Sequence, residues 1–523
     1  MEQSFFDRVK SFLIKERILG IPIPEDISKC NYENIHKDMC KEIFHSIKSG
    51  CEFYAFIDNY DRYDRYKQLE TETYFSPFIN NSKYLSSEEK VPEYYLHCSI
   101  LTDKMMDYDS FIQDDRMDVE FLNTFLKYKP YFIEFMIPVY EDGATECNAN
   151  IDKKIKEELS SVTSPMWFRA RYNKNCNRNS EYPYVKGKLV ECASPINFSD
   201  GYIEFVDKLN DTNLTDRINY IYNISDFSSS QDVEDVLTQT IKCPLNIARA
   251  YNIGHGNFIQ LRSDYSYPSM IYDIGYITKL QNTINKKSAN KAALQINASI
   301  VIISHWDSDH YWGAYTNEKL WNVPWIAPDC AEKGNITGKR LIRFLKKSKK
   351  MYLIKRLHTN QGTTSLTQPF AKLELKQQDF QLEIYRGCGK DRRITEKNCE
   401  GIAVKITNNS VSTLMCGDVP YFCLSDISTT KQQSYEYMIV PHHCSEMDTS
   451  KLNKQYLSIE NAIICEKKET KKKVMSNAHY AALSSITNKC YFTGDADLSL
   501  DFYLYKKYQV KIVDTCIDHY FMP

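Results

Sequence analysis

Short runs of apolar residues recur through the second half of this 523-residue chain, and several of them end at a glycine or an aspartate. Runs of this kind, bounded by turn signals, are typical of strands that are buried on both faces. Helical patterns separate them, notably at residues 279–294 and 339–350. Because buried strands alternate with helices, we predict a layered α/β domain. The predicted strands are residues 246–253, 270–274, 299–304, 411–416, 437–440 and 462–465.

The chain is too long for one ordinary hydrophobic core, so we predict two domains with a boundary between residues 235 and 236. The run DFSSSQD, residues 226–232, is the best linker candidate, since Ser and Asp cluster in loops and at helix starts. Residues 50–225 mix helical patterns with strand-like runs such as YFIEFMI, residues 131–137. We therefore expect an acidic α+β accessory domain, residues 1–235, before the α/β domain, residues 236–523.

Charge is distributed unevenly along the sequence. Residues 1–240 hold 28 Lys and Arg against 42 Asp and Glu, whereas residues 241–523 hold 38 against 26. A basic half favours an anionic substrate, and an acidic half could bind a protein partner or shield the basic half. Drift in surface composition is the alternative.

No stretch approaches the roughly 18 continuous apolar residues of a membrane span, and the N-terminal sequence MEQSFFDRVKSFLIKERI carries charges at helical spacing. The 17 cysteines include no C-x-x-C pair, which is typical of buried thiols in a reducing compartment. We therefore expect a soluble cytoplasmic protein without a membrane partner.

Four potential metal ligands follow one predicted strand. The stretch SHWDSDHYWG, residues 304–313, places His305, Asp307, Asp309 and His310 on the loop that leaves strand 299–304. Open α/β sheets bind ligands at the carboxyl ends of their strands, and imidazole and carboxylate groups are usual ligands of zinc. Aspartates that cap a helix, beside a core histidine, are the alternative. The density of ligand groups favours a metal site with room for two ions.

The spacing H-x-D-x-D-H resembles the H-x-[HD]-x-D-H signature of the metallo-β-lactamase superfamily. Its aspartate in the second ligand position resembles the metallo-β-lactamase domain of ComEC-type DNA-uptake proteins and their soluble relatives. Four further segments follow the order of that family. They are YNIGHGN at 251–257, MIYDIG at 270–275, LMCGD at 414–418 and VPHHCS at 440–445. The resemblance covers about residues 245–500 and implies an αββα fold there.

The resemblance implies ligands for two divalent ions, with zinc first and manganese or iron as alternatives. The implied ligands are His305, Asp307, Asp309, His310, Asp418 and one of His442 and His443. Asp418 would bridge the ions, and the sequence leaves open which of the two adjacent histidines is the ligand. The family's separate third histidine has no clear counterpart, and His358 is a weak candidate. A second Gly-Asp pair, Gly494-Asp495, follows the histidines in the wrong order and is interpreted as a turn.

The resemblance implies catalytic roles for Asp309 and for His479, which could contact a phosphate or protonate a leaving group. A surface histidine is the alternative for His479. Trp306 and Trp312 are expected either to pack in the core or to stack on a base. Two basic runs, residues 339–356 and 467–473, favour a groove that tracks phosphates over a plain solvated surface.

These features predict a metal-dependent hydrolase, a phosphodiesterase or nuclease that cleaves nucleic acid through a metal-bound hydroxide. One alternative is a metallo-hydrolase of a small ester, lactone or thioester, because one fold hosts many substrates. The other is a regulatory protein whose metal site no longer turns over and whose N-terminal half binds a partner. Neither a P-loop nor a G-x-S-x-G sequence is present.

Overall fold

The computed structural model describes most of the second half of the chain and part of the first half. The described residues are 43–58, 94–103, 105–106, 109, 133–139, 167–175, 182, 184–191, 197–208, 212–254, 256–263, 268–275, 297–329, 335–355, 369–375, 379–387, 396–424, 432–466, 475–496, 499–506 and 510–513. The predicted helix at 279–294 lies outside these residues.

The structure divides into two compact units, each built from two segments of the sequence. The first comprises Met1–Ile224 and Ala331–Ser348, and the second comprises Ser225–Cys330 and Lys349–Pro523. The predicted boundary between residues 235 and 236 falls inside α8 (Ser230–Thr240), a helix of the second unit. Ser229 starts this helix through a capping box with Asp232, so the predicted linker run includes a helix start.

The first unit contains a closed barrel of antiparallel strands in the order β1-β2-β3-β5-β6-β4, in which β4 pairs with β1. The strands are β1 (Glu52–Asp58), β2 (Tyr94–Leu101), β3 (Ile133–Val139), β4 (Trp167–Asn173), β5 (Tyr184–Glu191) and β6 (Asn197–Lys208). The run at 131–137 is confirmed as a strand by β3. Two helices, α7 (Thr212–Ile221) and α11 (Ile336–Lys347), add Ile218 and Ile336 to the core of this unit.

Helix α11 lies in the sequence between two strands of the second unit but belongs to the first unit. Its Arg340 Nε lies 2.7 Å from Asp109 Oδ2, and both side chains are buried. The hydroxyl of Tyr222 donates a hydrogen bond of 2.5 Å to the same oxygen. Lys339 is also buried. The prediction that residues 339–356 form a groove that tracks phosphates is therefore wrong for Lys339 and Arg340, because α11 packs this part of the run into a core.

The formal charge is more even between the units than between the two halves of the sequence. The segments of the first unit hold 34 Lys and Arg against 39 Asp and Glu, and those of the second hold 32 against 29. The net charges are −5 and +3. The difference arises because residues 331–348 carry basic side chains into the first unit, while the acidic residues of 226–235 belong to the second.

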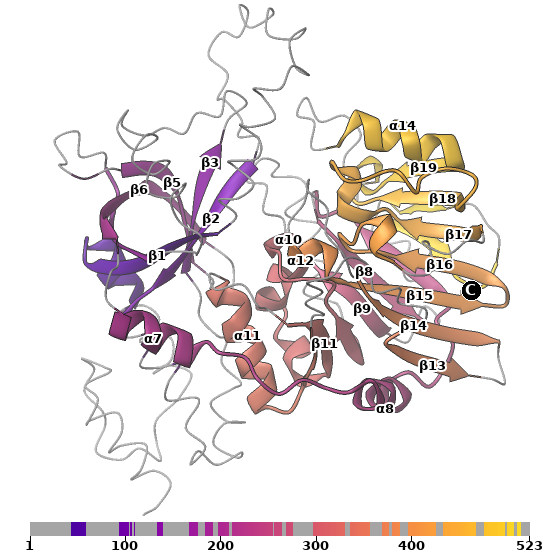
Figure 1. Cartoon of the computed structure of the whole chain (residues 1–523), viewed down its shortest axis with the longest axis horizontal. Coiled ribbons are helices and arrows are strands. Elements are labelled where there is room, and N and C mark those ends of the chain that lie inside the picture. Colours follow the sequence, from indigo (N-terminus) through magenta and orange to yellow (C-terminus); the bar gives the residue numbers. More distant parts are fainter. Residues whose placement is uncertain are drawn as a thin grey trace, which may run out of the picture. The chain divides into compact units, whose positions relative to one another are not determined.

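The second unit is a sandwich of two mixed sheets (Figure 1). One sheet has the strand order β12-β11-β10-β9-β8-β7-β20-β21, and the other runs from β13 to β19 in sequence order. The first sheet contains β7 (Ile247–Tyr251), β8 (Phe258–Arg262), β9 (Pro268–Ile274), β10 (Ile300–Ile302), β11 (Trp325–Pro328), β12 (Met351–Ile354), β20 (Ser499–Tyr503) and β21 (Lys511–Val513). The second contains β13 (Ala371–Leu375), β14 (Phe380–Arg386), β15 (Ile402–Asn408), β16 (Val411–Met415), β17 (Gln433–Ile439), β18 (Leu457–Ile464) and β19 (Thr487–Phe492).

Helical segments occupy the loops and cover the sheets. They are α8, α10 (Ser308–Tyr311), α12 (Glu396–Cys399), α14 (Asn477–Ile486), and the 3₁₀ segments η3 (Trp312–Thr316), η4 (Glu318–Asn322), η6 (Tyr421–Cys423), η7 (Pro441–Cys444) and η8 (Thr493–Asp495). Ile439 of β17 enters the core between the sheets, whereas the adjacent Met438 packs with Leu483 of α14 in a second core. The central strand β17 thus buries apolar side chains on both of its faces. The six predicted strands correspond to β7, β9, β10, β16, β17 and β18, so the prediction of a layered α/β domain is confirmed.

None of the helices in the described ranges combines the length and the apolar character that crossing a bilayer requires. The nine cysteines within those ranges form no disulfide.

Candidate metal centre

Four strands of the second unit carry polar residues from their carboxyl ends to one place. Asp273 is the penultimate residue of β9. His305 follows β10, Asp418 follows β16 and His442 follows β17. Since β9 is parallel to β10 and β16 is parallel to β17, each pair of strands ends at one edge of its sheet. The predicted positions at strand ends are therefore confirmed.

Hydrogen bonds join the two sheets next to these strand ends. Ile402 N donates to Ser304 O over 2.8 Å, and the buried Tyr272 hydroxyl donates to Ile402 O over 2.7 Å. Gly417 has a φ of +57°, and a Cβ atom there would lie 2.3 Å from Ser304 Cβ. Only glycine lets the backbone before Asp418 approach the loop after β10 so closely.

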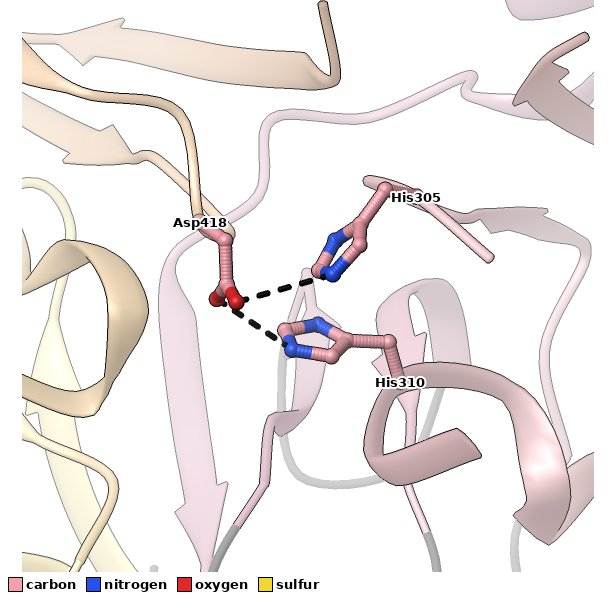
Figure 2. A group of neighbouring side chains, drawn as sticks. All are labelled: His305, His310 and Asp418. Carbon is pink, nitrogen blue, oxygen red and sulfur yellow. Dashed lines mark ion pairs between the residues drawn. The ribbon is translucent and has the colours of Figure 1, made fainter. Parts of the chain in front are cut away.

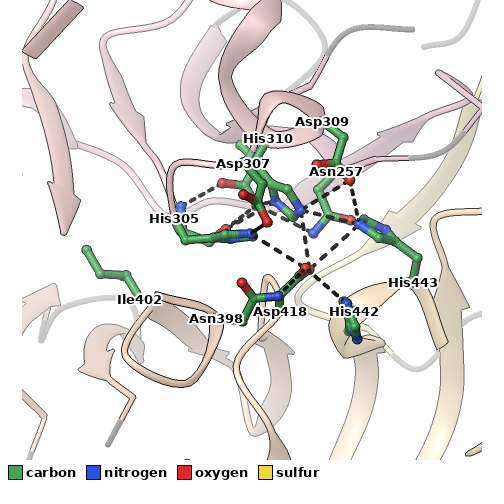
Figure 3. Close-up of polar contacts among 12 residues, drawn as sticks. Asn257, His305, Asp307, Asp309, His310, Asn398, Ile402, Asp418, His442 and His443 are labelled. Atoms are coloured by element: carbon green, nitrogen blue, oxygen red, sulfur yellow. Dashed lines mark hydrogen bonds and ion pairs between the residues drawn. The ribbon is translucent and has the colours of Figure 1, made fainter. Parts of the chain in front are cut away.

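The carboxylate of Asp418 lies among four histidines, and its two oxygens face different pairs of them (Figure 3). Oδ2 lies 3.5 Å from His305 Nε2 and 3.9 Å from His442 Nε2. Oδ1 lies 3.3 Å from His310 Nε2 and 3.6 Å from His443 Nε2. Figure 2 shows His305, from the segment that follows β10, and His310, from α10, both directed at the carboxylate of Asp418.

Each pair of histidines is accompanied by one further carboxylate. Asp307 Oδ2 lies 3.2 Å from His305 Nε2. Asp309 Oδ2 lies 3.2 Å from His443 Nε2 and 3.7 Å from His310 Nε2, and these two nitrogens are 3.3 Å apart. We call His305, Asp307 and His442 set A, and Asp309, His310 and His443 set B. The structure thus brings together the seven residues for which the resemblance implied a ligand role or left one open, and both adjacent histidines face Asp418.

Two of the imidazoles are oriented through their Nδ1 atoms. His310 Nδ1 donates to Asp273 Oδ2 over 2.8 Å. His305 Nδ1 lies 3.0 Å from Ser304 Oγ, whose own proton goes to Asp273 over 2.8 Å. Because the Asp273 carboxylate only accepts hydrogen bonds, Nδ1 of each imidazole carries a proton. Nε2 is therefore the nitrogen that would bind a metal ion, after loss of any proton that it carries.

An unusual backbone turn brings His442 and His443 to different oxygens of Asp418. His442, His443 and Cys444 have φ angles of 53°, 51° and 63°, all in the left-handed region. Such a conformation costs a non-glycine residue about 1–3 kcal/mol. His442 Nδ1 donates a hydrogen bond of 3.1 Å to Glu446 O. Nε2 is therefore the nitrogen of His442 that faces Asp418 Oδ2 in set A.

The buried atoms of the cluster fit divalent cations. His305 Nε2 and Asp418 Oδ1 are buried and make no hydrogen bond of acceptable geometry. A buried polar atom without a partner costs about 1–3 kcal/mol, and a cation next to each atom would remove that cost. Imidazole nitrogens with carboxylate oxygens are the ligands of zinc, manganese and iron sites.

The same groups shift one another's protonation. Burial alone would raise the pKa of Asp418, but the positive charges of His310, His305 and His443 outweigh it and hold the pKa of the carboxyl well below its usual range. Burial likewise opposes charge on His310, but neighbouring carboxylates, Asp418 first among them, raise its pKa well above the usual value. A cation that binds here displaces protons from the imidazoles, so its affinity falls at low pH.

His479 lies outside the cluster, at the start of α14. It is 1% exposed, so the alternative of a surface histidine is wrong. Its Nε2 lies 2.8 Å from the Tyr421 hydroxyl, and its Nδ1 lies 2.8 Å from Ser445 O. Burial lowers the pKa of His479 to about 4. The predicted catalytic role of His479 stays a prediction.

This buried imidazole should make the protein less stable in acid. In the unfolded chain the pKa of His479 has its ordinary value of 6.5, whereas burial in the folded chain lowers this pKa to about 4. The stabilisation is therefore complete above about pH 6.5 and is lost as the pH falls toward 4, by about 3 kcal/mol. Denaturant titrations should show that the advantage of the wild type over His479→Asn shrinks by this amount between pH 7 and pH 4. Ser476→Ala removes the cap of the same helix but no titratable group, and should keep the wild-type pH dependence.

The tryptophans near the cluster belong to the core. Trp306 and Trp312 are 3% and 0% exposed, and Trp306 Nε1 donates to Pro328 O over 2.7 Å. The packing interpretation is confirmed, and stacking of a base on either ring is wrong because both rings are covered. Gly494 and Asp495 lie in η8, which confirms the predicted turn. His358 and the basic run 467–473 lie outside the described residues.

Three residues that contact the cluster carry no predicted role. Asp273 and Ser304 orient the histidines, and Asn398 Nδ2 donates to Asp418 Oδ2 over 3.2 Å. An aspartate at the end of the apolar run MIYD was a usable signal for Asp273. Asn398 comes from α12, where the sequence carries no signal for it.

No protein-family model matches the chain, and no curated protein matches it. The chain is similar to the solved structure of the metallo-β-lactamase fold protein YhfI from Bacillus subtilis, with 11% identity and a TM-score of 0.29 over 49% of this chain and 99% of that chain. It is similar to the short form of human tRNase Z, with 10% identity and a TM-score of 0.26 over 48% and 92%. It is also similar to Zn²⁺-bound PqqB from Methylobacterium extorquens, with 8% identity and a TM-score of 0.29 over 47% and 98%.

Proposed function

We propose that the second unit is a hydrolase that uses two divalent metal ions and cleaves phosphodiester bonds in DNA or RNA. The observation that supports this most is the division of ligands by Asp418, whose Oδ2 faces set A and whose Oδ1 faces set B. A carboxylate shared between two groups of imidazole and carboxylate ligands is suited to two adjacent ions, about 3.5–4 Å apart in such hydrolases.

In this proposal, set A and set B would each hold one ion, zinc or else manganese or iron, and Asp418 would be a ligand of both. Ions of this kind lower the pKa of a coordinated water molecule and stabilise negative charge on a phosphoryl oxygen. Asp307 and Asp309 have side chains that are 15% and 16% exposed, more than the other members of the cluster. Substrate would therefore approach on their side, where Asp309 can accept a hydrogen bond from a reacting water molecule.

The phosphodiester class is supported by the five segments that resemble the ComEC-type domain. The net charge supports a phosphodiester substrate less than the sequence alone indicated, because the second unit carries only +3. That small charge favours, as a second candidate, the hydrolysis of a small ester, lactone or thioester in the same site.

Metal content and cleavage assays test the proposal on the full chain. We expect bound zinc, manganese or iron by elemental analysis, and cleavage of single-stranded DNA, duplex DNA or RNA that stops when a chelator removes the metal. Asp309→Ala should abolish cleavage, whereas Asp235→Ala, which removes an exposed carboxylate on α8, should not. Cleavage by Asp309→Ala at the wild-type rate would contradict the proposal.

Salt dependence separates the two candidate substrates. A protein that neutralises two or more phosphates should bind an oligonucleotide at least about tenfold more weakly at 200 mM than at 50 mM salt. We expect this for the inactive Asp309→Ala variant with a fluorescent oligonucleotide. Binding that does not change with salt, together with hydrolysis of a neutral ester, would favour the small-substrate candidate.

A further inference from the structure

His479 joins the two loops that carry the central ligands. Tyr421 lies in η6, three residues after Asp418, and its hydroxyl is 2.8 Å from His479 Nε2. Ser445 follows the turn of His442 and His443, and its carbonyl oxygen is 2.8 Å from His479 Nδ1. One imidazole on α14 therefore spans the Asp418 loop and the loop of the two histidines.

The hydrogen bonds of this imidazole have only one arrangement. The Ser445 carbonyl only accepts, so Nδ1 of His479 must donate to it, and Nε2 must accept from the Tyr421 hydroxyl. Tyr421 and His479 are 0% and 1% exposed, and their rings meet edge to face with centroids 5.6 Å apart. A fully satisfied buried network of this kind is rigid. Both ring nitrogens are engaged by the protein, so neither is left for a substrate.

The turn of His442 and His443 needs such support because three consecutive residues have positive φ angles. Strained backbone of this kind persists only where the surroundings hold it in several ways. His442 N donates to Gly417 O over 3.0 Å, and Ser476 N donates to Cys444 O over 2.9 Å. With the bond from His479 to Ser445, the N-terminal turn of α14 thus holds the far side of the turn at two points.

We propose that His479 is a positioning residue of the metal centre: together with Tyr421, it holds the turn of His442 and His443 against the Asp418 loop so that both ligand sets form. The inference rests on the proposed two-ion function. In this inference His479 positions the turn and does not contact a substrate.

Titration of the metal-free full chain with Zn²⁺, followed by calorimetry, tests the inference. We expect His479→Ala to bind at least one of the two ions about 10–100-fold more weakly than the wild type. Tyr421→Phe, which removes one hydroxyl, should weaken binding in the same direction by less. His479→Asn keeps a donor close to the position of Nδ1, so it should recover part of the affinity that His479→Ala loses.

Leu483→Ala is the matched control, because it removes a buried core side chain of α14 and leaves the ring contacts of His479 and the bond from Ser476 N in place. It should lose about 2–5 kcal/mol of stability and still bind Zn²⁺ within about twofold of the wild type, an effect well below that of an outer-shell partner. Equal weakening in Leu483→Ala and His479→Ala would overturn the inference, since general destabilisation would then explain both.

Other results separate this inference from the proposed function. Wild-type Zn²⁺ affinity in His479→Ala overturns the positioning role and leaves the two-ion site intact. If His479→Ala does not fold, Tyr421→Phe and His479→Asn decide in its place, and wild-type affinity in both overturns the role. Loss of cleavage in His479→Asn with unchanged Zn²⁺ affinity overturns it in favour of a direct catalytic role. A wild-type chain that binds no divalent ion overturns both proposals.

Discussion

Replacing Asp418 by asparagine should leave the chain unable to hold two ions and should lower its cleavage rate by more than about a hundredfold. Removing a group that merely orients a metal ligand costs about 10–100-fold. Asp418 is the one carboxylate in the described cluster that faces both ligand sets, so its loss affects every ligand pair at once. The asparagine amide has no negative charge and only one oxygen, and it cannot bridge two cations.

Elemental analysis after dialysis against Zn²⁺, with cleavage assays on the same samples, measures both effects. Asp501→Asn is the matched control, since Asp501 is also a buried carboxylate of the second unit and lies 2.5 Å from Arg249 Nη2. Breaking that pair should destabilise the fold by about 3–5 kcal/mol. It should nevertheless leave the metal content at the wild-type level. Two tightly bound ions in Asp418→Asn would show that the two sets are not bridged as proposed.

The ligand cluster could be predicted from sequence because its members occupy short loops after buried strands. Strand ends can be recognised from apolar runs, and parallel strands bring their carboxyl ends to one edge. That reasoning located His305, Asp418 and the histidine pair without knowledge of the sheet order. It could not show that Ser304 and Asp273 orient the imidazoles, because those contacts depend on how two strands lie side by side.

Helix α11 shows the limit of a division by sequence position. Its basic residues lie between strands of the second unit, so counting charge by halves assigned them to that domain. The helix instead contributes Ile336 to the core of the first unit and pairs Arg340 with Asp109. The pair Arg340–Asp109 joins residues more than two hundred positions apart, and local periodicity does not reveal such a contact. The charge of the second unit, +3, therefore favours a nucleic acid substrate less than the charge of residues 241–523 does.

The apparent absence of a third histidine has a similar explanation. The resemblance implied one ligand role for the pair His442-His443 and left open which of the two fills it. In an extended chain, adjacent side chains point in opposite directions. With both residues in the left-handed region, the two imidazoles instead reach different oxygens of the same carboxylate. His442 thereby faces Asp418 with set A and His443 with set B, so the pair supplies two imidazoles to the cluster where the resemblance implied one.

Single replacements of His442 and His443 by alanine should therefore each remove one ion, and a different one. His442→Ala leaves set A with His305 and Asp307, and His443→Ala leaves set B with Asp309 and His310. Titration with Zn²⁺ should give about one tight site in each variant where the wild type has two, as expected for a site that has lost one of its few ligands. His45→Ala, which removes an exposed histidine of the first unit, is the control.

Pairs of substitutions identify which ion each histidine holds. The double variant His442→Ala, Asp307→Asn carries both substitutions in set A. It should therefore bind as many ions as His442→Ala alone. Adding Asp309→Asn to His442→Ala damages both sets, so it should leave no tight site. Substitutions in one group of contacts are non-additive, whereas those in separate groups add. If instead His442→Ala keeps both ions while His443→Ala loses them, only one of the two histidines is a ligand, and the left-handed turn does not serve two sites.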